Sequence, residues 1–122
     1  MFLNTNERDI LGTLAIFFEK YPSEDFIVGG FVRDSFSNTP SRDIDIATTL
    51  NPEEIGPQLA KTVGGKSFVL NSERHITRIS GTYATGDKWQ IDLTHITNGI
   101  NENLSQRDFT INSMAVPLAQ YD

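Results

Sequence analysis

Residues 26–48 contain two short segments that together indicate the architecture of the chain. The first reads Phe26-Ile27-Val28-Gly29-Gly30-Phe31-Val32-Arg33-Asp34, and the second reads Arg42-Asp43-Ile44-Asp45-Ile46-Ala47-Thr48. Apolar residues before a glycine pair are typical of a buried strand that ends in a tight turn. Strict alternation in the second segment predicts another strand, with its isoleucines toward the core. Residues 31–36 are expected to form a short helix between the two strands.

Helical patterns occur on both sides of this segment. Residues 4–20 place apolar side chains at helical spacing, which predicts an amphipathic helix. A second helix is expected to begin at Asn51-Pro52 and to end near Gly64-Gly65, because Asn caps a helix and Pro fits its first position. Residues 103–115 are expected to be mostly helical, and Val116-Pro117 to leave that helix.

Three further segments show the alternation that is typical of strands: residues 67–70, 75–82 and 88–94. Residues 85–87 supply the turn between the last two. The predicted fold class is therefore α+β, a small mixed β-sheet with helices packed on one side.

Composition limits the kinds of protein that the chain can be. Its 122 residues suit a single domain, and the absence of cysteine excludes disulfides and thiolate metal sites. No apolar run approaches the ~18–20 residues of a membrane span, and the start lacks a signal peptide, so a cytoplasmic location is expected. The net charge of −6 is unfavourable for gripping RNA, although a carboxylate metal site must itself be acidic.

Asp43 and Asp45 are the main candidates for a metal site. In a strand, residues i and i+2 point to the same face, about 6.5–7 Å apart. Two carboxylates there suit a shared divalent ion, because Mg²⁺ takes oxygen ligands from one or two carboxylates and from phosphates. The alternative for an isolated Asp-x-Asp is a solvated strand face.

Gly29 and Gly30 are candidates for phosphate contact. Paired glycines let backbone N–H groups approach a phosphate closely, and the start of a helix favours anions. Arg33 lies one helical turn later and can reach the same anion. A tight turn beside a surface Arg33–Asp34 pair explains the same residues.

Two later segments carry weaker signals. Asp92, between Ile91 and Leu93, adds a third carboxylate if its strand lies beside Asp43 and Asp45, and is otherwise a surface or edge residue. Arg107, Asp108 and Asn112 suit contacts with phosphate, sugar or base, but equally suit a helix of mixed surface charge. His75 and His95 are isolated in the sequence and are expected at surface or strand positions rather than in a metal set.

In combination these segments resemble a known family. Residues 26–48 resemble the first motif of class II (bacterial-type) tRNA CCA-adding enzymes and related poly(A) polymerases, in the polymerase-β-like nucleotidyltransferase superfamily. Residues 102–115, which include Arg107-Asp108-Phe109-Thr110-Ile111-Asn112, resemble the second motif. The resemblance covers about residues 25–118.

The resemblance implies roles for individual residues. Gly30 and Arg33 would contact the incoming triphosphate, and Asp43 and Asp45 would hold two Mg²⁺ ions. Arg107 and Asp108 would contact the nucleotide, with Asn112 in support. Asp92 would be the third strand carboxylate that often completes the superfamily's metal site.

The implied function is template-independent transfer of CMP or AMP, from CTP or ATP, to an RNA 3′ end that is expected to belong to tRNA. Residues 1–122 would be the head domain of a longer protein, without the neck, body and tail that grip tRNA, and inactive or weakly active alone. Poly(A) addition by the same family remains open, as do a non-catalytic nucleotide-binding module and a plain structural domain.

Overall fold

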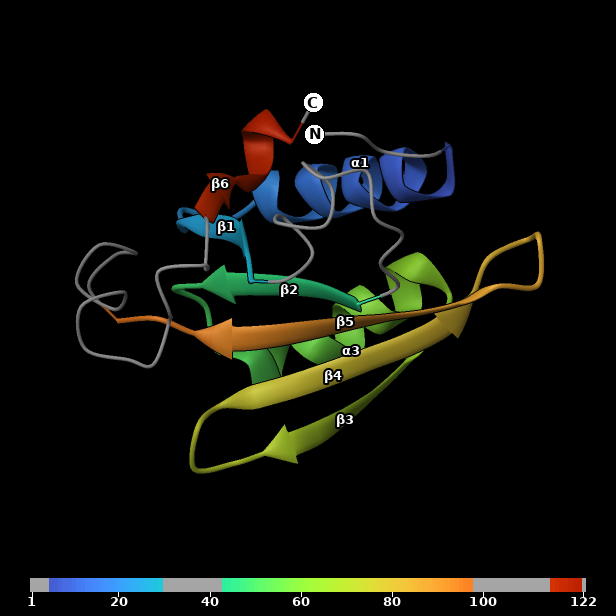
Figure 1. Ribbon diagram of the computed structural model, residues 1–122. Coiled ribbons are helices and arrows are strands. Elements are labelled where there is room, and N and C mark those ends of the chain that lie inside the picture. The colour runs from blue at the N-terminus through green and yellow to red at the C-terminus, as the bar shows by residue number, and fades with distance from the viewer. Residues whose placement is uncertain (1–4, 30–42, 98–114, 122) are drawn as a thin grey trace.

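The computed structural model describes residues 5–29, 43–97 and 115–121. Helix α1 (Thr5–Glu19) is followed by strands β1 (Asp25–Val28) and β2 (Asp43–Thr48), and then by helix α3 (Pro52–Val63). The chain continues through β3 (Lys66–Asn71), β4 (Ile76–Thr82) and β5 (Lys88–His95) to a short strand β6 (Ala115–Pro117) and a 3₁₀ turn (Leu118–Gln120). Figure 1 shows these elements around one twisted sheet.

The sheet has six strands in the order β3-β4-β5-β2-β1-β6. β2 and β5 run parallel, and all other neighbouring strands are antiparallel. The parallel pair lies at the centre, and antiparallel strands flank it on both sides. The sheet is therefore mixed, as the sequence predicts.

The helices α1 and α3 pack on the same face of the sheet. Their apolar side chains form one core with the inward-facing residues of the strands: Ile27 from β1, Ile44 and Ile46 from β2, Ile79 from β4, and Trp89, Ile91 and Leu93 from β5. Among the described residues, the opposite face carries a small cluster of Val28, Ala47 and Ile96, with Phe26 beside it. The predicted α+β arrangement with helices on one side is confirmed.

Helix α3 begins and ends where its sequence predicts. The Asn51 side chain accepts a hydrogen bond from the Glu53 N–H at 3.0 Å, and Pro52 is the first helical residue. Gly64 ends the helix with φ of 75°, a left-handed conformation that glycine adopts without cost. Gly64-Gly65 is thus a helix end followed directly by β3.

The prediction for Ala115 is wrong, because this residue begins β6 rather than ending a helix. β6 pairs antiparallel with β1, so that Ile27 lies opposite Val116 and Phe26 opposite Pro117. Pro117 is tolerated there because β6 is the edge of the sheet, where a missing N–H costs no ladder bond. The helices predicted for residues 31–36 and 103–114 lie outside the described residues.

Within the described part of the chain, none of the helices is long and apolar enough to cross a membrane.

Candidate active site

A row of four side chains crosses the face of the sheet that the helices leave open. Strand pairing places Val28 opposite Asp45, Asp45 opposite Asp92, and Asp92 opposite Arg78. These residues come from β1, β2, β5 and β4 in turn. Two carboxylates and one guanidinium from distant parts of the sequence are therefore brought side by side.

Asp43 and Asp45 share the open face of β2, as their spacing predicts. Their neighbours Ile44 and Ile46 are 1% and 0% exposed and face the core, whereas Asp43 is exposed and Asp45 half-buried. Asp43 pairs with Gln90 of β5, two register positions before the Asp45–Asp92 pair and on the same face. Asp43, Asp45 and Asp92 thus occupy nearby positions on two parallel strands, and these three residues are called the acidic row below.

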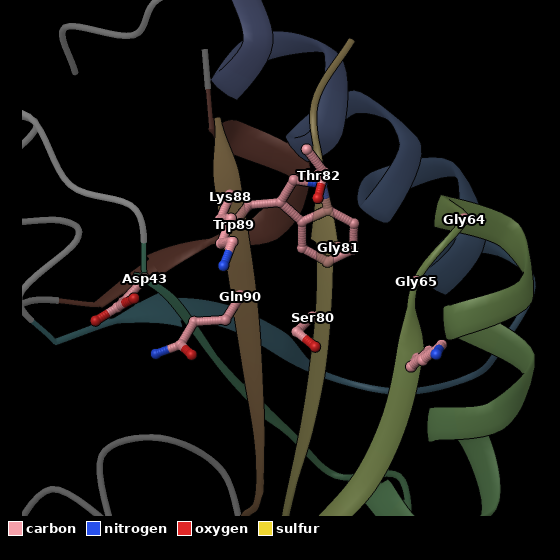
Figure 2. A pocket seen from close by; sticks show the side chains of 10 residues that line it. Asp43, Gly64, Gly65, Ser80, Gly81, Thr82, Lys88, Trp89 and Gln90 are labelled. Carbon is pink, nitrogen blue, oxygen red and sulfur yellow. The ribbon is translucent and has the colours of Figure 1, made fainter. Parts of the chain in front are cut away.

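A hollow of about 690 Å³ extends from Asp43 toward the start of β3. Figure 2 shows Asp43 and Gln90 on one side of it and Gly64 and Gly65 on the other. Lys66 and Lys88 also line it. The hollow therefore offers both carboxylate and ammonium groups beside the acidic row.

The electrostatic state of Asp45 reflects this crowding of negative charge. Its pKa is raised from 3.8 to about 6, mainly by burial and in smaller part by the carboxylates of Asp92 and Asp43, while Arg78 lowers it. Burial and like charges both disfavour an ionised carboxylate. A cation bound at this position would remove the like-charge part of that cost.

Asp92 forms a two-pronged ion pair with Arg78. Arg78 donates from Nε to Oδ1 at 2.8 Å and from Nη2 to Oδ2 at 3.0 Å, so both carboxylate oxygens accept a bond. Among the described residues, no three His, Cys, Asp or Glu side chains converge closely enough to hold a metal ion. In this state the acidic row presents Asp43 and Asp45, with Asp92 held by Arg78.

Gly29 allows close approach to the Asp45 carboxylate. A Cβ at this position would lie 2.9 Å from Asp45 Oδ2, and Gly29 has φ of 74° as β1 ends. Any larger residue would therefore meet both backbone strain and the carboxylate. The sequence marked Gly29 for phosphate contact, and the structure adds that it borders the carboxylate site.

Comparison with known families matches residues 25–121 to the poly A polymerase head domain. That range includes the whole acidic row. The chain belongs to the poly A polymerase head domain family. The resemblance noted from the sequence motifs is thus confirmed.

The chain is also similar to curated proteins that are named as nucleotidyltransferases or CCA-adding enzymes. The chain is 36% identical over 102 residues to a CCA-adding enzyme of Enterococcus faecalis, covering 76% of this chain and 25% of the relative. It is also 36% identical over 98 residues to a CC-adding tRNA nucleotidyltransferase of Geobacter sulfurreducens, covering 80% of this chain and 22% of that protein. The chain spans about a quarter of the length of these curated relatives.

Solved structures of CCA-adding enzymes share the fold of this chain. A Thermotoga maritima CCA-adding enzyme complexed with tRNA-CCA has a TM-score of 0.76 and 28% identity, covering 95% of this chain and 27% of that one. A CCA-adding enzyme in complex with ATP has a TM-score of 0.78 and 26% identity, covering 95% and 28%. The six-stranded sheet and its helices therefore match those of known nucleotidyltransferases.

The remaining predicted nucleotide-binding residues of this head domain lie outside the described residues. They are Gly30, Arg33, Arg107, Asp108 and Asn112. Their roles stay predictions.

His75 and His95 lie at surface and strand positions, as predicted: His75 is exposed in the turn before β4, and His95 ends β5. The His75 and His95 rings contact each other edge to face, with centroids 6.0 Å apart. His95 Nδ1 also lies 3.0 Å from the Leu50 carbonyl oxygen. The two residues meet because the turn before β4 folds over the end of β5, which sequence separation alone does not indicate. They do not belong to any metal-binding group of three within the described segments.

Arg78 is the site residue that sequence reasoning missed. It lies in the predicted strand 75–82 at an outward-facing position, which was the available signal. Its pairing with Asp92 depends on the register between β4 and β5, and only the structure supplies that register.

Proposed function

We propose that this chain is the catalytic head of a template-independent RNA nucleotidyltransferase, which transfers CMP and AMP from CTP and ATP to a tRNA 3′ end. The observation that carries the proposal is the same-face pair Asp43 and Asp45, placed in a family head domain whose relatives are named for CCA and CC addition. The proposed parent protein is longer than residues 1–122, and its proposed location is the cytoplasm.

The acidic row fits a divalent cation. Enzymes of this family generally use divalent metals, and we propose two Mg²⁺ ions here. Asp43 and Asp45 would bind them, since hard cations prefer carboxylate oxygens, and the pKa of Asp45 is raised by burial and also by the neighbouring Asp92 and Asp43 carboxylates. The chemistry that Mg²⁺ supplies when bound is to make the attacking 3′-hydroxyl more acidic and to neutralise the triphosphate.

The other candidate residues would position the nucleotide. Gly29 and Gly30 would let backbone N–H groups approach the triphosphate, and Arg33 would pair with it. Arg107 and Asp108 would contact the nucleotide, with Asn112 in support. Asp92 is proposed as a further carboxylate, available once it leaves Arg78.

The alternative within the family is poly(A) addition. The family description itself favours it, whereas the relatives' names favour CCA and CC addition. The groups identified in this chain address phosphate, sugar and metal, so they serve either reaction. A non-catalytic nucleotide-binding module is disfavoured, because such a module has no need of two same-face carboxylates on β2.

The test uses the natural protein that contains this chain. Tritiated ATP and α-labelled CTP would be supplied separately and together, with Mg²⁺ and tRNA transcripts that lack all or part of the 3′-CCA. The proposal predicts extension by one to three nucleotides, resolved on a sequencing gel. Long ladders with ATP alone would establish poly(A) addition instead, and failure to incorporate either nucleotide would overturn the proposal.

A further inference from the structure

Arg78 lies next to the proposed metal site, and the proposed function gives it no role. It lies in β4, opposite Asp92 of β5, which in turn lies opposite Asp45 of β2. The side chain is 27% exposed and that of Asp92 is 17% exposed, so the pair is largely shielded from solvent. An arginine held in this way is part of the site rather than of the surface.

The contact between Arg78 and Asp92 is bidentate, with one hydrogen bond to each carboxylate oxygen. Nε and Nη2 of Arg78 each donate to a different oxygen of Asp92, at 2.8 and 3.0 Å. Planar two-pronged pairs of this kind fix the orientation of both groups. Asp92 is thereby tied to Arg78 of β4, although its carboxylate still lies close enough to raise the pKa of Asp45.

The charge of Arg78 also acts on Asp45. Of the charged groups that act on the Asp45 carboxylate, Asp92 and Asp43 raise its pKa and Arg78 lowers it. Lys66 and Lys88 line the hollow beside Asp43, further along the open face. Arg78 therefore compensates the acidic row at the point where Asp45 and Asp92 adjoin.

We propose that Arg78 is a built-in counter-cation of the carboxylate site, which competes with a divalent metal ion for Asp92. This inference rests on the proposed function. Without metal, Arg78 offsets one of the three negative charges of the row and keeps Asp92 ordered. With metal, Asp92 joins Asp43 and Asp45 only by giving up its two bonds to Arg78, and the guanidinium repels the incoming cation. Arg78 thus makes metal binding weaker and the metal-free site more stable.

The inference is tested by Mn²⁺ binding to the natural protein without nucleotide, measured by isothermal titration calorimetry and by the electron paramagnetic resonance signal of free Mn²⁺. Arg78→Gln is expected to bind Mn²⁺ more than about tenfold more tightly than the parent protein: removal of one positive charge ~8 Å from a divalent ion accounts for about fivefold, and the release of Asp92 accounts for the rest. Its metal-free melting temperature is expected to fall, and the rise in melting temperature on adding Mn²⁺ to be larger. Arg74→Gln is the matched control, because Arg74 is an exposed arginine in the turn before β4 and its removal changes net charge equally.

Two more variants separate competition from general charge effects. Arg78→Lys keeps the charge but loses the two-pronged contact, so a smaller increase in Mn²⁺ affinity is expected; this variant decides the matter if Arg78→Gln fails to fold. In an Asp92→Asn background, Arg78→Gln is expected to have less than half its effect, because the contested carboxylate is gone.

The outcomes are distinguishable from failure of the proposed function. Unchanged or weaker Mn²⁺ binding by the Arg78 variants, with normal binding by the parent, would overturn this inference alone. Weaker binding in particular would mean that Arg78 positions Asp92 as a ligand instead of withholding it. Absence of Mn²⁺ binding by the parent protein would overturn the metal site itself, and the inference with it.

Discussion

Asp45 is under the greatest electrostatic stress of the described residues in the site. Burial, with a smaller contribution from the Asp92 and Asp43 carboxylates, raises its pKa to about 6. Because the pKa is raised in the folded protein, the favourable contribution of Asp45 is complete only below pH ~4 and is lost as pH rises through 6. At neutral pH without metal, ionised Asp45 therefore costs stability.

Replacing Asp45 with Asn tests this cost directly. In EDTA at pH 7.5, Asp45→Asn is expected to raise the free energy of unfolding by about 3 kcal/mol, since the pKa is raised from 3.8 to about 6 and one pKa unit corresponds to about 1.4 kcal/mol. Near pH 3.5 the two proteins should be equally stable, because Asp45 is then protonated. Urea denaturation at both pH values measures the difference, with Glu73→Gln in the exposed turn as the control. If Asp45→Asn were less stable than the parent at pH 7.5, ionised Asp45 would not cost the parent protein stability, and this account of Asp45 would be wrong.

The residues of the site were only partly predictable. Alternation in Asp43-Ile44-Asp45-Ile46 gives the face of each side chain, so the Asp43–Asp45 pair follows from sequence alone. The position of Asp92 beside Asp45 requires that β5 be the parallel neighbour of β2, and the ion pair with Arg78 requires the β4–β5 register. Register between distant strands depends on the packing of the whole sheet, which local pattern does not contain.

At the scale of elements, local signals succeed where the element is stabilised locally. β2 spans Asp43–Thr48 and α3 spans Pro52–Val63, as predicted, because alternation and end caps act within a few residues. β6 was missed for the opposite reason. Its three residues form a strand only because they meet β1, which is almost ninety positions earlier in the chain.

The edge strand β3 carries an unusual apolar surface. Phe68, Val69 and Leu70 are 48%, 49% and 45% exposed on a strand with only one partner. Exposed apolar edges promote sheet-to-sheet association, and a lysine there blocks it. Val69→Lys is therefore expected to lower aggregation during thermal unfolding with little change in stability. Light scattering during a thermal ramp measures this.

The control for the edge is Ile16→Lys. Ile16 is 68% exposed on α1, so this variant makes the same chemical change away from any strand edge. Equal suppression of aggregation by both variants would show that hydrophobicity in general, and not the β3 edge, is responsible.

At the scale of the whole molecule, the chain is expected to hold nucleotides without reading their bases. The contacts proposed for the chain are made to phosphate, sugar or metal. Its net charge of −6 leaves little positive surface to neutralise RNA phosphates. Base discrimination requires donors and acceptors matched to a base edge and held rigidly.

Calorimetry on residues 1–122 tests whether this domain binds nucleotides without distinguishing their bases. CTP, ATP, GTP and UTP in excess Mg²⁺ are expected to bind weakly and with similar affinity. A preference for one base above about tenfold, or ~1.4 kcal/mol, would show that the head reads bases by itself.

The central claim is that Asp43 and Asp45 hold the catalytic metal ions of a nucleotidyltransferase, and nucleotide transfer by variants of the natural protein tests it most directly. Incorporation of labelled CMP and AMP into tRNA ends would be compared for the parent, Asp43→Ala, Asp45→Ala and the control Asp87→Ala, which removes an exposed aspartate in the β4–β5 turn. Thermal unfolding of each variant would establish that it is folded. Both site variants are expected to lose at least about 10³-fold in transfer, the scale on which enzymes depend on charge stabilisation, while Asp87→Ala stays close to the parent. Transfer within about tenfold of the parent (~1.4 kcal/mol in barrier height) by a folded Asp43→Ala or Asp45→Ala variant would contradict the claim.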